Sequence, residues 1–380
     1  MSVEHARDRT PSEGPAPATR PHDESPVRPE FPRAPSQGRA RLPNGFDFEA
    51  AVVAPFRMQP GLRRLQAGAT QLTPLAPGCR AQREKLAVLC AFWRQALVQT
   101  PGFDAAPAWA AVAAHAAAEH PQHWQWDGTR GAAPRLGVAV ADGAVVDLGR
   151  GAFGLGDEIG RCLRGLPEPW RLAGLFALTF LEDLAIVDGA SGTVPWMAVT
   201  LPSHWAPEDK VGLHFGAIHG PVADNRLLLD AGPALMRMVC GGQRWERFVW
   251  TVTDHPRLHA HPQRLDPQRW PAGAATVLPG QAWWRTERQT FLPVPAAGQA
   301  VFTIAVDVQA LASAIDDPGQ AGALRDAVET MSEEVLGYRG LVPVRAALLA
   351  WLERQADAGR HRPSPPAAFT PGTAPPATEP

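Results

Sequence analysis

Cysteine is scarce in this 380-residue chain, and its positions exclude several kinds of metal site. The four cysteines are Cys79, Cys90, Cys162 and Cys240, and they form no C-x-x-C pair. An iron–sulfur cluster or a structural zinc ion needs clustered ligands, so neither is expected within this chain. Because the N-terminus also has no apolar signal segment, the sequence indicates a reducing, cytoplasmic location.

Long apolar runs and a strong net charge are also missing. No stretch approaches the roughly 18 consecutive apolar residues of a membrane-spanning helix, so no such helix is expected. The formal net charge is −2 and there is no basic block, so an electrostatic surface for nucleic acid is not expected either. The Gly-rich stretch GAFGLGDEIG (151–160) lacks the strand–helix–strand context of a dinucleotide site.

The two ends of the chain differ in composition from the rest. Residues 1–43 and 358–380 are rich in proline and poor in large apolar residues. Such segments bury too little apolar surface to offset the entropy lost on ordering, so both are expected to be disordered tails. Residues 44–357 remain, which suffice for one large domain or two small ones, and we interpret them as one domain.

Within residues 44–357, strands dominate the middle and helices lie at both ends. Helices are expected at 81–98, 107–119, 168–182, 308–316, 319–333 and 343–356. Strands are expected at 184–187, 196–201, 247–252, 283–294 and 299–308, with a further hairpin at 137–148 that turns at Asp142-Gly143. Short turns between successive strands favour antiparallel pairing, so the predicted fold class is α+β, with helices packed on an antiparallel sheet.

The stretch VGLHFGAIHGPV (211–222) places two histidines, His214 and His219, among glycines and aliphatic residues. Their spacing puts them on opposite faces of a strand and about 140° apart on a helix, which argues against two ligands of one metal ion. One of them can still be a single ligand, because the glycines at 212, 216 and 220 would let a flat group approach the backbone. The alternative is a buried strand with hydrogen-bonded histidines.

Two other groups of polar residues were weighed as sites. His255, His259 and His261 lie in DHPRLHAHP, where two prolines and the lack of an acidic cluster favour a surface loop over a zinc site. Ser203 and His204 are adjacent, but adjacency is not the geometry of a nucleophile and its base. Since no G-x-S-x-G motif is present, a serine hydrolase is disfavoured.

Glu182 and Asp183 are expected where the helix at 168–182 ends and a strand begins. A helix dipole does not favour carboxylates at its C-terminal end. These two residues are therefore expected to have a specific partner, such as an arginine, and a structural role.

The segment WWRTERQTFL (283–292) alternates polar and aromatic residues. On a regular strand one face carries Trp283, Arg285, Glu287, Gln289 and Phe291, and the other carries Trp284, Arg288, Thr290 and Leu292. An exposed edge with alternating charges is one interpretation. The other is a pocket wall, on which Glu287 would offer an anion to a cationic substrate or accept a proton.

Several segments, taken in order, resemble one family. They are FRMQPGLRRL (56–65), LEDLAIV (181–187), LPSHWAPEDKVG (201–212), IHGPV (218–222), RTERQTFLPV (285–294), VFTIAV (301–306) and YRGLVPVRAALLAWL (338–352). Across roughly residues 52–356 the chain resembles the alpha subunit of haem-dependent oxidative N-demethylase and its relatives. The resemblance implies a PAS-like haem-binding core within residues 44–357.

The same resemblance implies an activity and its cofactors. The expected reaction is oxidative demethylation, by O2, of a small secondary amine such as dimethylamine, with release of formaldehyde. The chain would bind haem b, while NADPH, flavin and a 2Fe-2S cluster would act through a separate reductase. The lack of a dinucleotide fingerprint and of cysteine clusters is consistent with this division.

Residue by residue, the resemblance makes His219 of IHGPV the first choice for the axial ligand of the haem iron, and His214 the second. Gly216 and Gly220 would let the haem lie close to the backbone. Glu287 of ERQT would bind the substrate nitrogen, and Arg285 and Arg288 would hold haem propionates or support Glu287. Parity makes Arg285 the expected neighbour of Glu287.

The chain departs from the family in a few places. RWERFVWTV (244–252) is a loose match, His204 stands where a small or polar residue is expected, and Tyr338 is the single tyrosine. Two alternatives therefore stand beside the enzyme. One is a non-catalytic PAS-like sensor of haem or a small molecule, and the other is a metal hydrolase that uses the three histidines of DHPRLHAHP.

Overall fold

The computed structural model describes residues 44–270 and 278–360. The tail expected at 1–43 lies outside the described residues, and so does all but the first part of the tail expected at 358–380. Its first three residues are described, and they continue the C-terminal helix α13 (Arg345–Arg360).

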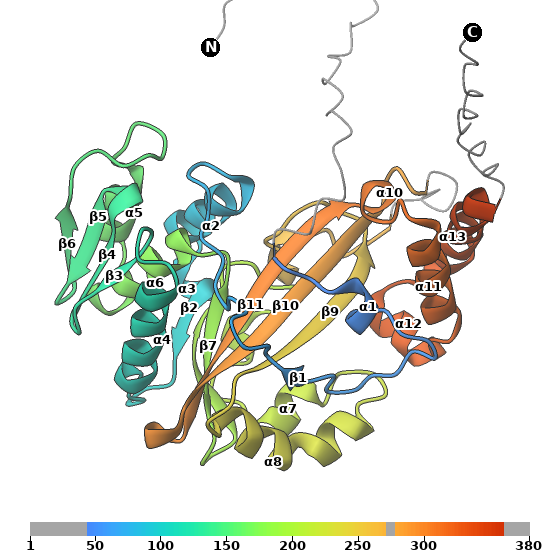
Figure 1. Cartoon of the computed structure of the whole chain (residues 1–380), viewed down its shortest axis with the longest axis horizontal. Coiled ribbons are helices and arrows are strands. Elements are labelled where there is room, and N and C mark those ends of the chain that lie inside the picture. The colour runs from blue at the N-terminus through green and yellow to red at the C-terminus, as the bar shows by residue number, and fades with distance from the viewer. Residues whose placement is uncertain (1–43, 271–277, 361–380) are drawn as a thin grey trace, which may run out of the picture. The chain divides into compact units, whose positions relative to one another are not determined.

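A seven-stranded sheet forms the centre of the fold (Figure 1). Its strands lie in the order β1-β9-β10-β11-β7-β8-β2, and every neighbouring pair is antiparallel. Their bounds are Arg63–Arg64 (β1), Leu97–Gln99 (β2), Asp183–Asp188 (β7), Thr193–Ala198 (β8), Trp245–Thr253 (β9), Trp283–Val294 (β10) and Gln299–Ala310 (β11). The expected α+β class with an antiparallel sheet is therefore confirmed.

The consecutive strands β7 to β11 make up the body of this sheet. The first of them, β7, pairs with the last, β11, so both lie in the middle, with β8 on one side and β10 and β9 on the other. This order agrees with the PAS-like sheet expected from the resemblance. The long β10–β11 hairpin pairs in unbroken register from Trp283↔Ala310 to Val294↔Gln299, as the alternating sequence predicts.

A second, four-stranded sheet precedes the main one in the chain. It consists of β3 (Gln125–Trp126), β4 (Arg130–Ala133), β5 (Val138–Ala141) and β6 (Ala144–Asp147). Asp142 and Gly143 both have positive φ, at 47° and 76°, as a type I′ turn requires. The hairpin expected at 137–148 is therefore confirmed.

Helices cover the face of the main sheet that carries Trp250, Trp284 and Val301. Residues of α4 and α6 pack with Val301 and Leu184 in one apolar cluster, and the C-terminal helices pack with Trp250 and Trp284 in another. The remaining helix bounds are Phe48–Ala51 (α1), Arg80–Ala91 (α2), Trp93–Ala96 (α3), Ala106–Glu119 (α4), Glu158–Gly165 (α5), Glu168–Thr179 (α6), Leu311–Ala314 (α10), Pro318–Glu329 (α11) and Glu333–Arg339 (α12).

The opposite face of the main sheet packs against α8 (Arg226–Cys240), whose residues Leu235, Met236 and Val239 meet Phe291 and Ala300. This helix was not expected from the sequence. Ala81 of α2 packs with Ile304, Val306 and Val308 on this face as well. On the helix-covered face, the segment at Asn44 also lies over β10, because the Asn44 side chain donates to Thr286.

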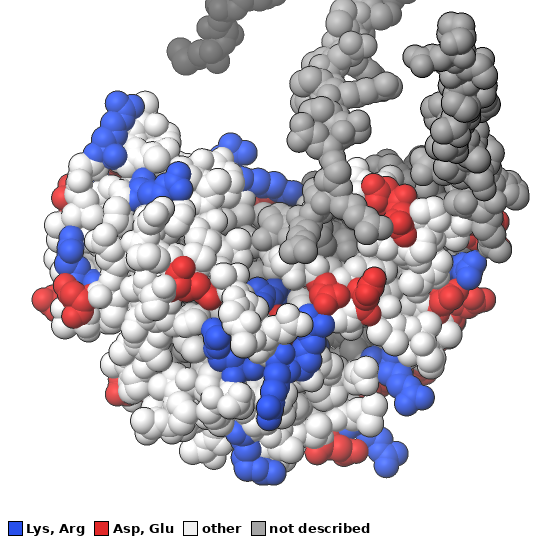
Figure 2. Space-filling view, in the orientation of Figure 1, with Lys and Arg blue, Asp and Glu red and all other residues white. Residues whose placement is uncertain are grey.

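The helices of the described residues were compared with the length and composition of a membrane-spanning helix. Among residues 44–270 and 278–360, no single helix is long and apolar enough to cross a membrane, and α12 and α13 pass on length and composition only as a pair bent by 101°. On the face shown in Figure 2, basic and acidic side chains lie in small groups of both signs.

The expected partner of the carboxylates at 182 and 183 is a lysine, not an arginine. Lys85 on α2 donates to Asp183 over 3.0 Å, and both side chains are fully buried. Asp183 also accepts from the Thr200 hydroxyl and the Leu201 amide, each at 2.6 Å. Glu182 instead accepts from the Thr73 amide over 2.9 Å, so both carboxylates tie distant segments to the start of β7.

Replacing Lys85 by methionine is expected to lower the free energy of unfolding by roughly 3–5 kcal/mol, because Asp183 would keep a buried charge without its counter-ion. Urea denaturation measures this change. Arg161→Gln is the matched control, since it breaks an exposed pair with Asp157 at 3.1 Å and should cost less than about 1 kcal/mol. Equal losses in the two variants would contradict this account of the buried pair.

Glu182 is expected to make the protein less stable as pH rises. Burial raises the pKa of Glu182 to about 7 in the folded state, above its ordinary 4.5. The folded protein therefore holds a proton that the unfolded chain has lost between these values, and stability falls as pH rises from 4.5 to 7, by on the order of 3 kcal/mol. Glu182→Gln should flatten the dependence in urea titrations across this window, and an unchanged slope would contradict the assignment.

Candidate functional site

Strand β10 presents two sets of polar side chains, one on each face of the sheet, as parity predicts. Arg285, Glu287 and Gln289 lie on the face covered by α8 and loops. Arg288 lies on the other face, where its guanidinium pairs with Glu246 at 3.0 Å. Arg288 is therefore separated from Glu287 by the sheet itself and has a partner there. The structure does not bring it together with the other candidate residues.

Glu287 is nearly buried and held at both carboxylate oxygens. The Ser203 hydroxyl donates to Oε1, and the Gln289 amide donates to Oε2 over 2.6 Å. Arg285 donates through Nε to the same Ser203 oxygen over 2.8 Å. Arg285 is thus the neighbour of Glu287 on one face, linked through Ser203. The sequence could not single out Ser203 for this role, because the loop that carries it is distant along the chain.

Arg285 connects β10 to two loops through hydrogen bonds. Its terminal nitrogens donate to the carbonyls of Arg257 at 3.0 Å, Pro202 at 3.1 Å and Leu258 at 2.9 Å. Burial lowers the pKa of Arg285 to about 10, while the charge of Glu287 acts in the opposite direction. Since most of its donors are used by these carbonyls, Arg285 positions the loop around Glu287 rather than facing an incoming ligand.

The histidine-bearing stretch 211–222 forms a short helix, α7 (Phe215–His219), and not the buried strand that was considered. His214 is its N-cap, because its Nδ1 accepts from the Gly216 amide over 3.1 Å. The His214 ring also lies over Gly192, where an added Cβ would come within 2.7 Å of Nε2. Capping explains why a histidine stands here. His214 is exposed and tied to the helix start, whereas His219 ends the helix.

The side chain of His219 is a neutral imidazole. Its Nδ1 lies 2.9 Å from the Phe215 carbonyl, and its ring stacks on the Phe215 ring at 4.0 Å between centroids. A carbonyl accepts a hydrogen bond, so the proton is on Nδ1 and Nε2 keeps its lone pair. Burial, helped by the charges of Arg247 and Lys210, lowers the pKa of His219 to about 4, while the hydrogen bond to the Phe215 carbonyl acts in the opposite direction.

The site also includes two cationic side chains that were not singled out from the sequence. Arg247 on β9 stands opposite Gln289 on β10, and it interacts electrostatically with both Glu287 and His219. Lys210 approaches the Ile218 carbonyl at 3.5 Å. Strand parity could have indicated Arg247, because it stands between apolar residues in the strand 245–253. The contact of Lys210 with α7 depends on how the loop folds back.

Gly216 and Gly220 do not have to be glycine for the protein's own packing. An added Cβ at Gly216 would meet His214 Nδ1 at 3.5 Å, and one at Gly220 would meet the Gly216 carbonyl at 3.4 Å. Both are ordinary contact distances. Close approach of a flat ligand to these two glycines stays a prediction. Gly212, with φ of 79°, does need the left-handed conformation.

Two of the three histidines of DHPRLHAHP, His259 and His261, hold the loop through hydrogen bonds. His259 Nδ1 bonds with the Thr200 carbonyl at 2.7 Å, and the buried His261 meets Glu208 at 3.1 Å. Within residues 44–270 and 278–360, no three His, Cys, Asp or Glu side chains are grouped so that they could hold a metal ion. The geometry of these residues does not favour the hydrolase alternative, and His261 is not part of a surface loop as expected.

The candidate site therefore gathers His219, Glu287, Ser203, Gln289 and Arg247 from α7, two strands and one loop. Tyr338 on α12 is about half exposed (51%), and its partial burial and the charge of Glu287 raise the pKa of its hydroxyl. The arrangement offers a neutral imidazole nitrogen and a carboxylate with fixed partners. Such a pair can serve as a metal ligand and an ammonium-binding base.

Comparison with known protein families gives one match in this region. Residues 167–349 match the family described as haem-dependent oxidative N-demethylase, alpha subunit-like. The matched range contains the whole of β7 to β11 together with α7 and α8. It also contains the candidate residues His219 and Glu287, whereas β1 and β2 lie before it.

Proposed function

We propose, from the match of residues 167–349 to the haem-dependent oxidative N-demethylase alpha subunit-like family, that this chain demethylates a small secondary amine. The substrate would be dimethylamine or a close relative, and the products formaldehyde and the primary amine. The observation that carries the proposal is that Arg247 interacts both with a neutral His219 and with the doubly hydrogen-bonded Glu287.

The donor set fits a haem group. An axial imidazole has to be neutral at the nitrogen that binds iron, with its second nitrogen hydrogen-bonded. His219 meets both conditions, since its pKa is lowered to about 4 and its Nδ1 bonds with the Phe215 carbonyl. His219 would hold haem b through Nε2, and Gly216 and Gly220 on the same segment would leave room for it. His214 is the weaker choice, because its Nδ1 is used to cap α7.

When bound, the haem would supply the activation of O2 and the one-electron chemistry that side chains lack. The protein's own contribution would begin at Glu287. A dimethylammonium ion has two N–H bonds, and each oxygen of Glu287 keeps one lone-pair site beyond its bond to Ser203 or Gln289. Glu287 can therefore bind the cation and take one proton from its nitrogen, which leaves the neutral amine needed for oxidation.

Arg285 and Arg247 would act on the orientation and the electrostatic surroundings of this carboxylate. Arg285 fixes Ser203, and through it the Oε1 side of Glu287. The charge of Arg247 interacts with that of Glu287 on the same face of the sheet. Arg288, on the other face, has no place in this scheme beyond its pair with Glu246.

The overall reaction consumes the amine, O2, two electrons and two protons, and gives the demethylated amine, formaldehyde and water. The family is described as alpha subunit-like, which implies a partner subunit. We place the source of electrons on that partner, a reductase that uses NADPH, flavin and a 2Fe-2S cluster. The sparse cysteines of this chain support that division of labour.

A visible spectrum tests the proposal directly. The purified chain, supplied with haem b, should give a Soret band that shifts on addition of dimethylamine, and with a reductase it should release formaldehyde. No Soret band after reconstitution would refute the haem assignment. A Soret band with no amine response and no turnover would instead favour the alternative of a PAS-like haem sensor.

A further inference from the structure

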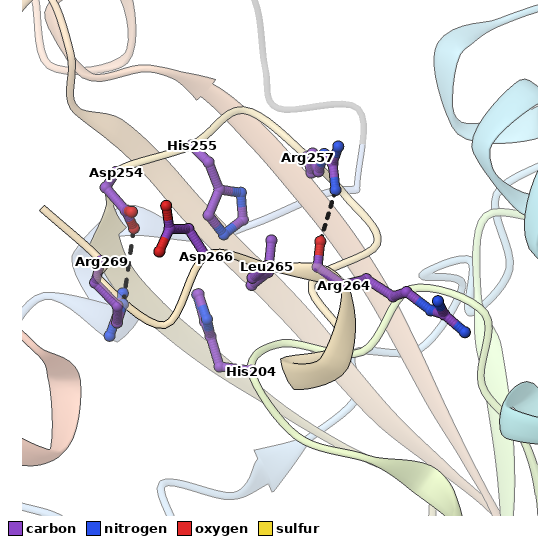
Figure 3. A pocket seen from close by; sticks show the side chains of 8 residues that line it. All are labelled: His204, Asp254, His255, Arg257, Arg264, Leu265, Asp266 and Arg269. Carbon is purple, nitrogen blue, oxygen red and sulfur yellow. Dashed lines mark hydrogen bonds and ion pairs between the residues drawn. The ribbon is translucent and has the colours of Figure 1, made fainter. Parts of the chain in front are cut away.

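A cavity of about 280 Å³ lies apart from Glu287 and His219, among the loops that follow β8 and β9. Figure 3 shows His204 and His255 reaching into it from different segments of the chain, with their ring centroids 5.2 Å apart. Arg269 and Asp254 lie along one side of it, and the exposed Asp266 lies nearby. Neither the proposed haem ligand nor the proposed amine-binding residue lines this cavity.

Buried nitrogens without partners converge on this cavity. Within the described part of the chain, both ring nitrogens of His255 are buried and lack a hydrogen-bond partner, and so are Nε and Nη2 of Arg269. Arg269 Nε forms an ion pair with Asp254 Oδ1 at 3.7 Å, which leaves Nη2 of Arg269 and the two ring nitrogens of His255 without any partner among the described residues. Buried polar atoms nearly always have partners, so three such atoms on residues that line one cavity point to a ligand with acceptor atoms.

The guanidinium of Arg269 has one nitrogen left for a ligand. Its Nε pairs with Asp254 Oδ1 at 3.7 Å, and its Nη1 donates to the Arg339 carbonyl over 2.7 Å. Nη2 can still donate to an oxygen of a carboxylate. The two contacts fix the guanidinium in place beside the cavity.

The electrostatic potential at the two imidazoles is positive. The pKa of His204 is lowered to about 2 by burial and then by the charges of Arg269 and Arg285, and that of His255 to about 4 by burial, Arg285, Arg269 and Arg257. Both rings are therefore neutral near pH 7, and each can donate one N–H. The carboxylates Asp254 and Asp266 also line the cavity and limit how much negative charge a ligand can bring.

His204 is held in its position by a backbone conformation that side chains rarely adopt. Its φ is 63°, and its amide donates to the Ala260 carbonyl over 2.9 Å. A residue with a Cβ in this region is strained, and such strain is retained mainly where the surrounding structure requires it. The strained backbone directs the ring of His204 toward His255.

We propose that this cavity binds a small carboxylate. Nη2 of Arg269 would donate to one of its oxygens, and a ring N–H of His255 would donate to the same group. The cavity volume and the two acidic residues beside it restrict the ligand to a small monoanion. The site is separate from the proposed haem site, so it would serve a second ligand of the protein.

The test is a titration of the purified full-length chain with acetate at pH 7, followed by NMR of the histidine C2 protons. Saturable shifts are expected. His255→Phe keeps a flat ring and removes both nitrogens, and it should weaken acetate binding by at least about 10-fold. Arg269→Gln should do the same. Because His255 makes no hydrogen bond that the fold depends on, its variant should remain folded even if the Arg269 variant does not.

Arg161→Gln is the control, since Arg161 is an exposed cation that pairs with Asp157 away from the cavity. It should bind acetate like the unmodified chain. Equal binding by the His255 variant, or no saturable binding at all, would overturn the proposal. So would loss of acetate binding on addition of haem, because the cavity would then hold a haem carboxylate. None of these results alters the test of the haem assignment, which is read from the Soret band.

Discussion

Replacing His219 by alanine is expected to lower haem affinity by more than about 100-fold, since changes in the outer partners of a metal ligand alone cost roughly 10- to 100-fold. The variant should lose its Soret band in a haem titration at equal protein concentration. The reason is specific to His219, whose Nδ1 is occupied by the Phe215 carbonyl and whose Nε2 keeps its lone pair. The ring is half-buried, so its loss should not unfold the protein.

His214→Ala is the matched control on the same helix. His214 caps α7 through a bond to the Gly216 amide, so its loss should cost about 1 kcal/mol of stability. It should leave the Soret band in place. If the His214 variant loses haem and the His219 variant keeps it, the two assignments have to be exchanged. If both variants keep haem, the axial ligand lies elsewhere.

Glu287→Gln is expected to keep haem and to lower amine turnover by roughly 10²- to 10⁴-fold, the usual contribution of a general base. Glutamine has nearly the same shape and can still accept from Ser203, but it carries no charge for an ammonium ion and takes no proton. The amine-induced shift of the Soret band should disappear as well. Formaldehyde release with the reductase and difference spectra with dimethylamine measure the two effects.

Glu208→Gln is the control for this variant. Glu208 is a partly exposed carboxylate on the loop after β8, and it meets His261 at 3.1 Å instead of the candidate site. Its variant should turn over amine at the normal rate. Normal turnover in the Glu287 variant would remove Glu287 from the mechanism, while loss of haem from it would show that the residue acts on the fold of the pocket.

The β10–β11 hairpin could be predicted because its signal is local. Alternation along 283–294 and the short turn before Gln299 define the strands, and parity alone places Arg285 with Glu287 and Arg288 on the other face. The secondary structure of the stretch 211–222 was not predicted, for the opposite reason. It is short, apolar and rich in glycine, so neither strand nor helix period is visible, and the cap made by His214 is a contact that only the folded chain shows.

The partners of the candidate site depend on long-range packing, which a single sequence does not reveal. Ser203 meets Glu287 across 84 positions of the chain, and Lys85 meets Asp183 across 98. Each contact depends on which loop or helix closes over which strand. Glu182 and Asp183 were recognised from the sequence because they stand at a helix end where negative charge is unfavourable. The residue that pairs with them could not be named. The one residue type suggested, an arginine, was wrong.

The two edges of the main sheet have a consequence for how the protein can be divided. Both edge strands, β1 and β2, come from residues before 167, and so does Lys85, the buried counter-ion of Asp183. A fragment cut to residues 167–349 would expose unpaired strand edges on both sides and leave Asp183 without its cation. Residues 167–349, which match the family, are thus not expected to fold by themselves. A shortened protein would have to begin near Asn44, whose side chain donates to Thr286 on β10.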